Sequence, residues 1–457
     1  MYSLVFEDRE FYKIFIKLAI PLALQDLIAS SLNMVDTVMI GQLGETEIAA
    51  VGLSNQIFFL LNLFLFGICS GAAIFTAQFW GKRDIPGIRR VLGIGLMIGV
   101  SIAFLFSLVA FFIPEQVLGI FSKDRNVIVL GSQYLRMVCF SYMMTAITFV
   151  YAFILRSTGQ VKLPMVVSVI SLGLNTIFNY LLIFGHAGFP ALGVEGAAIA
   201  TVMARLVEMS SLLLIIYIKG YAPAAKINEM LNISVEFIKR FLGTTMPVFF
   251  NEALWSLGVT MYMFAYARMG TKVVTSVNIA STVERIALVT FAGMAHASAV
   301  MIGNQIGAND ESKAFAYARK FTVLGPFLGL FMGLTVILTS QWILSIYNVS
   351  HEVYSWANKI LFVLSLVMPI KIFNMINIVG ILRSGGDTKF SLIIDTAGVW
   401  FIGVPLAFIG GLVWKLPIYW VYALIVLEEV FKAIIGVKRF MSKKWINNLV
   451  NCSQETA

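Results

Sequence analysis

The sequence predicts an all-α integral membrane protein of twelve transmembrane helices in two six-helix bundles related as parallel internal repeats. Its 457 residues are 59% hydrophobic and only 12% charged, whereas soluble domains contain about 25% charged residues. Apolar runs long enough to cross a bilayer follow one another almost from end to end, and motifs of the first half return in the second. This pattern leaves no room for a large soluble domain.

Each apolar run is interpreted as one span, because about 20 helical residues cross the hydrocarbon core. The expected spans are 14–40, 50–79, 91–113, 128–155, 163–185, 196–218, 243–267, 273–302, 321–346, 358–382, 390–413 and 418–437. Basic residues concentrate in the tails and the even-numbered connections, so the positive-inside rule predicts that both termini are cytoplasmic. We expect a multi-pass protein of the plasma membrane. Its partner is the lipid bilayer, and we expect no binding to nucleic acid.

Three motifs occur in both halves at a common separation of about 226 residues. The pairs are Pro21 with Pro247, 78–84 with 304–310, and 154–159 with 381–386. Chance would not hold one separation across three distant motifs. The chain therefore contains an internal duplication.

A polar stretch near the middle of the chain divides the two repeats. It predicts a cytoplasmic linker, 219–242, between an N-terminal lobe, 1–218, and a C-terminal lobe with a short cytoplasmic tail, 243–457. Because each lobe has six spans, both lobes cross the membrane in the same direction. Transporters built on this plan carry substrate near the midplane between the repeats and work by alternating access.

Asp36 is a carboxylate inside the otherwise apolar first span. A charge at mid-membrane costs about 2.5–3.5 kcal/mol on insertion scales, and such residues usually face a water-filled interior. Asn175 and Asn179 share a face of the fifth span, at a depth similar to that of Asp36. One carboxylate with two amide oxygens suits sodium, and the carboxylate alone can carry a proton. We predict a cation-coupling site here; the alternative is that the asparagines only hydrogen-bond between helices.

The chain resembles the multidrug and toxic compound extrusion (MATE) family along essentially its whole length. The resemblance rests on the segments 34–41 and 49–52, the Leu-Arg-Ser-x-Gly motifs at 155–159 and 382–386, and the two asparagines of the fifth span. It implies cation-coupled export of organic, often cationic and amphipathic, compounds. The coupling ion would be sodium or a proton, with no other cofactor.

The C-terminal lobe contains a second set of membrane-embedded charges. Glu252 repeats the position of Asp26, one turn after the matched proline. Glu252, Lys371 and Asp395 fall at similar depth in the cytoplasmic half of their spans. Lys371 is therefore expected to pair with Asp395 or Glu252, either as a static ion pair or as groups that exchange partners during transport.

Two other charged pairs have helical spacing and are interpreted as structural: Arg205 with Glu208, and Glu428 with Lys432. The substrate cavity should be wide and mostly apolar. Its candidate polar lining residues are Asn55, Gln56, Asn278 and Glu284.

Other function classes fit the sequence less well. Phosphate-loop, zinc-protease and serine-hydrolase motifs are absent from the sequence, so an enzyme is not expected. A flippase for lipid-linked precursors is the main alternative, but it would need several basic residues in its cavity to meet pyrophosphate. We expect small organic molecules as substrates, and a monomer, because the two repeats form their own cavity.

Overall fold

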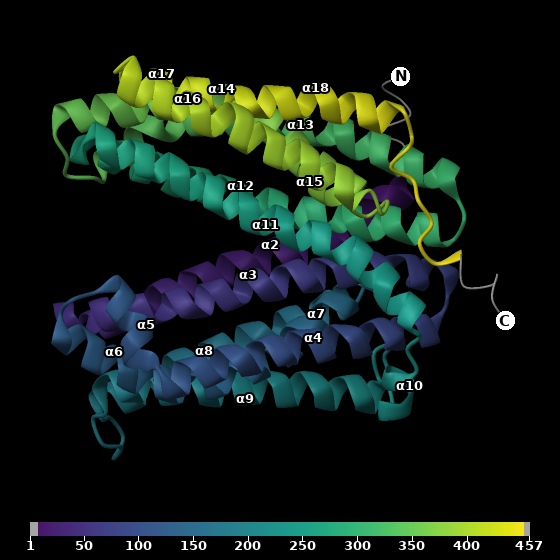
Figure 1. Cartoon of the computed structure of the whole chain (residues 1–457), viewed down its shortest axis with the longest axis horizontal. Coiled ribbons are helices and arrows are strands. Elements are labelled where there is room, and N and C mark those ends of the chain that lie inside the picture. The colour runs from purple at the N-terminus through teal and green to yellow at the C-terminus, as the bar shows by residue number, and fades with distance from the viewer. Residues whose placement is uncertain (1–7, 452–457) are drawn as a thin grey trace. The chain divides into compact units, whose positions relative to one another are not determined.

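The structure is a computed structural model that describes residues 8–451, apart from the side chain of Thr290 (Figure 1). Within these residues the fold is helical and contains no strand. The helices of the first half are α2 (Arg9–Gly41), α3 (Glu45–Lys82), α4 (Ile85–Phe112), α5 (Pro114–Phe121), α6 (Arg125–Val138), α7 (Phe140–Ser157), α8 (Lys162–Phe184) and α9 (Gly193–Lys219). After the short α10 (Ile227–Leu231) come α11 (Val235–Met269), α12 (Thr271–Gly307), α13 (Glu311–Ser345), α14 (His351–Met375), α15 (Thr388–Ala397), α16 (Val404–Phe408), α17 (Ile418–Ile425) and α18 (Leu427–Met441). Three π-helical turns accompany them: η1 (Ile376–Leu382), η2 (Gly398–Gly403) and η3 (Ile409–Val413).

The twelve-helix prediction is confirmed, because each expected span coincides with one helix or with consecutive helical segments. Ten of the described helical stretches are long and apolar enough to cross a membrane. The remaining two spans are α11, whose interior carries Asn251 and Glu252, and the pair α17 and α18, which a break at Val426 separates. Helices extend beyond the predicted spans, because helical hydrogen bonding continues into polar ends that a hydropathy pattern leaves out.

Interruptions occur in the tenth and eleventh spans, where π-helical turns replace α-helix. Pro405 is the second residue after η2. Proline lacks a backbone N–H and removes one helical hydrogen bond, so a wider turn before it accommodates the lost bond. The end of α15 carries Asp395, whose contacts are described below.

The internal repeat is visible in the backbone as well as in the sequence. Arg83 and Asn309 occupy matched positions and both have a left-handed conformation, with φ of 61° and 60°. The next residue in each half is an aspartate, Asp84 or Asp310, and it caps α4 or α13 by accepting a backbone N–H at 2.9 Å. Such a cap satisfies one of the free N–H groups at a helix start. The two copies of this motif therefore start a helix in the same way, with a left-handed residue followed by a capping aspartate.

The chain divides into two compact units. The N-terminal unit comprises Leu24–Trp80 and Asp84–Leu242, and the C-terminal unit combines the residues up to Ala23, Gly81–Arg83 and the residues from Gly243 onward. This division differs from the predicted lobes in the assignment of the start of α2 and of the α3–α4 turn. The predicted lobe and linker boundaries accordingly stay a prediction.

The predicted linker folds onto α4 in the N-terminal unit. Glu229 of α10 forms a 2.5 Å ion pair with Arg89 of α4. The pKa of Glu229 is lowered because the backbone N–H of Lys226 donates to its carboxylate at 2.7 Å and Arg89 adds its positive charge. The polar stretch is thus attached to the bundle at this point.

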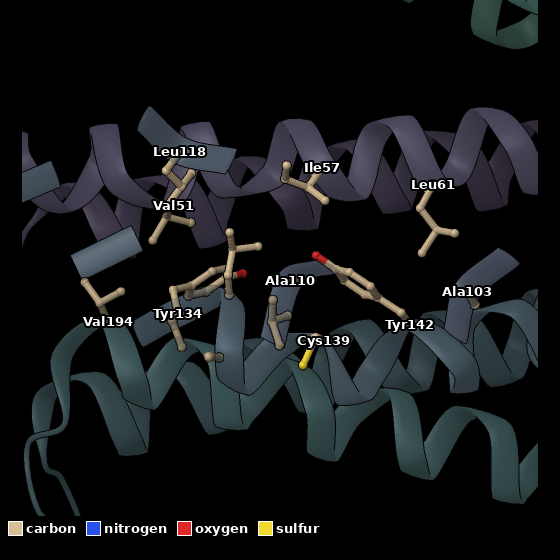
Figure 2. Close-up of a cluster of buried hydrophobic side chains, with 14 of the residues drawn as sticks. Val51, Ile57, Leu61, Ala103, Ala110, Leu118, Tyr134, Cys139, Tyr142 and Val194 are labelled. Atoms are coloured by element: carbon tan, nitrogen blue, oxygen red, sulfur yellow. The ribbon is translucent and has the colours of Figure 1, made fainter. Parts of the chain in front are cut away.

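A buried core fills the N-terminal unit and forms one wall of the site. Figure 2 shows Tyr134 of α6 and Tyr142 of α7 pointing toward α3. Tyr142 is fully buried, and its ring lies 5.7 Å from that of Phe58. Aromatic side chains of this size contribute much of the apolar surface that a core buries. Tyr134 belongs to this core and also borders the cavity described next.

Candidate functional site

The structure brings the three residues of the predicted coupling site together in the N-terminal unit. Asn179 Nδ2 of α8 donates to Asp36 Oδ1 of α2 at 3.0 Å. The same nitrogen lies 3.5 Å from Asn175 Oδ1, and Asn175 Nδ2 lies 3.5 Å from Thr201 Oγ1 of α9. Matching depth along the spans therefore predicted correctly that these side chains lie close together.

Helix packing explains how these polar groups are held. α8 and α9 lie side by side (Figure 1), and the hydroxyl of Ser171 donates to the backbone oxygen of Ala204 at 2.7 Å. Asn175 and Asn179 are one helical turn apart and are 6% and 2% exposed. Buried amides are costly unless hydrogen-bonded. Within residues 8–451, however, Asn179 Oδ1 is buried without a hydrogen-bond partner.

The oxygen atoms at this site determine which ion it can hold. Asp36 supplies a carboxylate, and Asn175 and Asn179 supply amide oxygens, which are hard ligands suited to sodium. The described residues contain no cluster of three or more His, Cys, Asp or Glu that could hold a metal ion. Carboxylate and amide oxygens suit hard cations better than soft transition metals.

A cavity of about 320 Å³ opens beside this group. Asp36, Asn175, Asn179, Asn55 and Arg205 are among its lining residues, together with apolar side chains. Its size lies within the usual range of about 300–1,000 Å³ for small-molecule sites. An intramembrane carboxylate, amide oxygens and a small-molecule cavity thus occur at one place.

Arg205 is a charged lining residue whose place in the site the sequence did not predict. The predicted pair with Glu208 is confirmed, with Nη1 and Oε2 2.7 Å apart. Helical spacing identified this pair but did not show that Arg205 would face the cavity. The cavity wall consequently combines an ion-paired arginine with the carboxylate of Asp36, which accepts a hydrogen bond from Asn179.

The four predicted lining residues lie in different surroundings. Asn55 lines the cavity. Gln56 and Asn278 are exposed and lie outside this cavity. Glu284 bonds to Lys371 and to the hydroxyl of Tyr422 in the C-terminal unit. The lining role predicted for these last three residues therefore stays a prediction.

The predicted pairing of Lys371 with Asp395 or Glu252 is wrong. Lys371 Nζ bonds instead to Glu284 of α12. Asp395 forms a 2.8 Å ion pair with Lys432 and accepts a 2.9 Å hydrogen bond from Asn251. Depth along the membrane was estimated from sequence, but the direction of each side chain around its helix depends on which helices pack together. α14 packs against α12, and this contact sets the partner of Lys371.

Glu252 has a partner that sequence reasoning missed. Arg383, of the second Leu-Arg-Ser-x-Gly motif, is 3% exposed, and its Nη1 lies 2.7 Å from Glu252 Oε1. In the first repeat Arg156 Nη2 donates to Gln25 Oε1 at 3.0 Å. Each repeat therefore uses the motif arginine to bind a polar side chain one turn after the matched proline. The repeat aligns Glu252 with Asp26 and not with Gln25, so the sequence contained no clear signal for this contact.

The C-terminal unit also contains more buried acids than buried lysines. Lys432, 3% exposed, contacts Asp395 and Glu428, the latter at 3.6 Å as predicted from helical spacing. Tyr262 donates to Glu428 at 2.5 Å, and Asn374 donates to Glu429 at 2.7 Å. The charged groups linked by these and neighbouring electrostatic contacts are Glu284, Asp395, Glu428, Glu429, Lys371 and Lys432. Four carboxylates thus accompany two lysines in this group.

The MatE family model matches residues 21–181 and 247–409 of the chain. The chain belongs to the MATE family. Because this is a family of transporters, the protein is a multi-pass membrane transporter and not an enzyme. The two matched segments fall on the two internal repeats.

Individual relatives of this MATE protein are distant in sequence. It is 25% identical to the "Uncharacterized transporter YisQ" of Bacillus subtilis, over 90% of both chains. It is 23% identical to the "Probable multidrug resistance protein NorM" of Thermotoga maritima, over 96% of this chain and 94% of that protein. The crystal structure of the Vibrio cholerae MATE transporter VcmN in its bent form has a TM-score of 0.87 at 19% identity, with 97% of this chain and 98% of that chain covered. This likeness confirms the fold.

Proposed function

We propose that this MATE protein exports organic, often cationic and amphipathic, compounds by cation-coupled antiport. Its lobes would alternate access to the two sides of the membrane, as in other transporters with parallel repeats. The observation that carries the proposal is the cavity at Asp36, where a membrane-embedded carboxylate bonds to Asn179 beside space for a small molecule. The name of the Thermotoga maritima relative, a probable multidrug resistance protein, supports the same substrate class.

The site supplies a simple basis for exchange. When Asp36 binds sodium or a proton its negative charge is neutralised, and when the ion leaves the charge returns to the cavity wall. When Asp36 is charged, it attracts a cationic substrate into the cavity. When Asp36 has bound an ion, the substrate is held less strongly and can leave. Competition for one carboxylate therefore couples inward ion movement to outward substrate movement.

The coupling ion is tested by imposing the two gradients separately. Vesicles containing the purified protein are loaded with a fluorescent organic cation, and its transport is followed under a sodium gradient at equal pH and under a pH gradient without sodium. A tenfold gradient supplies about 1.4 kcal/mol for each ion exchanged, so under the effective gradient we expect the dye to reach a steady-state concentration ratio of about tenfold across the vesicle membrane, and no such ratio without a gradient. The effective gradient identifies the ion. Failure of both gradients with every cation tested would reject the antiporter proposal.

We further propose that Glu252, Lys371 and Asp395 take part in transport, the last two through the carboxylate-rich group of the C-terminal unit and Glu252 through its pair with Arg383. Lys371 and Glu284 are 19% and 17% exposed, so their charges lie mostly out of water. A proton or cation arriving at the four carboxylates would change the partners of Lys371 and Lys432. The proposal predicts that these ion pairs rearrange during the cycle.

Lys371→Gln is expected to lower efflux per folded protein by at least about fivefold, the lower end of usual coupling energies between sites. The matched control is Lys272→Gln, which breaks another lysine–glutamate pair whose side chains are 60% and 46% exposed. Efflux is measured in vesicles at equal amounts of folded protein. Unchanged efflux with a reduced folded yield would assign Lys371 to a static ion pair.

A flippase for lipid-linked precursors is less well supported. Binding pyrophosphate requires cations that are free to meet it. Most of the intramembrane cations that the structure describes have a carboxylate partner, namely Arg205, Lys371, Arg383 and Lys432. Arg156 bonds to the amide of Gln25, and Arg285 is exposed on α12. We also propose that the protein is a monomer of the plasma membrane with both termini in the cytoplasm. Its coupling ion is sodium or a proton.

A further inference from the structure

A second cavity, of about 590 Å³, lies in the C-terminal unit and plays no part in the proposed transport site. It forms where the end of α13, the middle of α14 and the start of α17 meet. The side chains that define it are Gln341, Lys359, Phe362, Leu366, Tyr419 and Trp420. α14 packs against both α13 and α17, so it forms the floor of a groove bordered by the other two helices.

The floor of this groove changes from charged to apolar along α14. Lys359, Phe362 and Leu366 are spaced by three and four residues and therefore lie on one helix face. Phe362 is 54% exposed and Leu366 is 60% exposed. At 1.5 Å per residue, the lysine and the leucine are roughly 10 Å apart along the axis. The groove offers one cation at one end and an apolar track beyond it.

The charged end has the chemistry of an anion site. Lys359 Nζ lies 4.5 Å above the ring of Tyr419, and no carboxylate within residues 8–451 is in ion-pair distance. The amides of Gln341 and Asn358 border the same space. An ammonium group and amide N–H donors together suit a phosphate, which accepts several charge-assisted hydrogen bonds.

The position of this end matches a membrane interface. Tyr419 and Trp420 are the second and third residues of α17, and Gln341 lies in the last turns of α13. Trp420 is 57% exposed. Tyrosine and tryptophan concentrate at the level of lipid headgroups, where one part of the ring is apolar and the other is wet. The cation thus lies near headgroup depth and the apolar track runs toward the membrane interior.

We propose that this groove binds one anionic phospholipid. Lys359 contacts the phosphate region, Gln341 and Asn358 bond to headgroup oxygens, and one acyl chain lies along Phe362 and Leu366. A soluble anion would leave the apolar track unfilled, and a zwitterionic lipid would gain less from an unpaired lysine. The cavity volume lies within the usual range for ligand sites.

Native mass spectrometry of the purified full-length protein tests the proposal, with phosphatidylglycerol and phosphatidylcholine added at equal concentration. The wild type should retain more phosphatidylglycerol. Lys359→Gln should reduce this preference by about fivefold, the effect of one lysine near an anionic lipid surface. Lys359→Arg should keep the preference. Lys415→Gln, an exposed lysine of the connection before α17 and outside the cavity, is the matched control and should change nothing.

Three results would overturn the proposal. The first two are no preference of the wild type for phosphatidylglycerol and an unchanged preference in Lys359→Gln. The third is release of phosphatidylglycerol by glycerol 3-phosphate, which would make the ligand a soluble anion. If Lys359→Gln does not fold, Phe362→Ala replaces it. That variant keeps the charge, and it should lower retention of both lipids by shortening the apolar track. Unchanged retention in Phe362→Ala would equally reject the site.

Discussion

Asp36→Asn is expected to abolish gradient-driven efflux of an organic cation, lowering it at least about tenfold while leaving folded yield unchanged. The substitution removes the negative charge that attracts the coupling ion and the substrate. A hydrogen bond to a charged group contributes about 1.5–3 kcal/mol, which corresponds to roughly tenfold or more in binding. The new amide oxygen can still accept the bond from Asn179, which is 3.0 Å long in the structure. The measurement is dye efflux from vesicles, normalised to folded protein.

The matched control for this variant is Asp124→Asn. Asp124 lies in an exposed connection and caps α6 by accepting the backbone N–H of Asn126 at 2.9 Å. Asparagine caps helices as well as aspartate does, so efflux should not change. If Asp36→Asn transports as fast as the wild type, Asp36 is structural and the coupling role passes to Glu252 and Lys371.

Arg383→Gln should have the largest effect on stability. Arg383 and Glu252 form a pair whose side chains are 3% and 17% exposed. Removing one member leaves an uncompensated charge in the membrane bundle, which typically costs about 3–5 kcal/mol. The expected result is a strong loss of folded, monodisperse protein in gel filtration and a lower unfolding temperature.

The double variant Arg383→Gln with Glu252→Gln distinguishes charge from shape. It removes both charges and allows the two amides to bond to each other, so folded yield should recover in large part. Lys272→Gln is the comparison for an exposed pair, because the side chains of Lys272 and Glu352 are 60% and 46% exposed; surface pairs contribute about 1 kcal/mol or less. A double variant as unstable as Arg383→Gln would show that packing of the arginine, and not its charge, is what matters.

The order of the helices was determined by the sequence, since apolar length and loop charge act locally along the chain. The repeated motifs predicted a duplication, and the left-handed Arg83 and Asn309 followed by capping aspartates carry it into the backbone. The helix interruptions were not predictable. The π-helical turns and the break between α17 and α18 do not change the hydropathy of the sequence, so no clear sequence pattern marks them.

Among the candidate site residues, Asp36, Asn175 and Asn179 were predictable because rare polar groups at one depth of a membrane tend to be partners. The partners in the second half were not. Glu252, Lys371 and Asp395 share a depth, yet each bonds to a different residue: Arg383, Glu284 and Lys432. Depth follows from counting residues along a helix, whereas direction depends on which helix faces pack together. Only the tertiary structure decides that, because it depends on close packing between residues far apart in the chain.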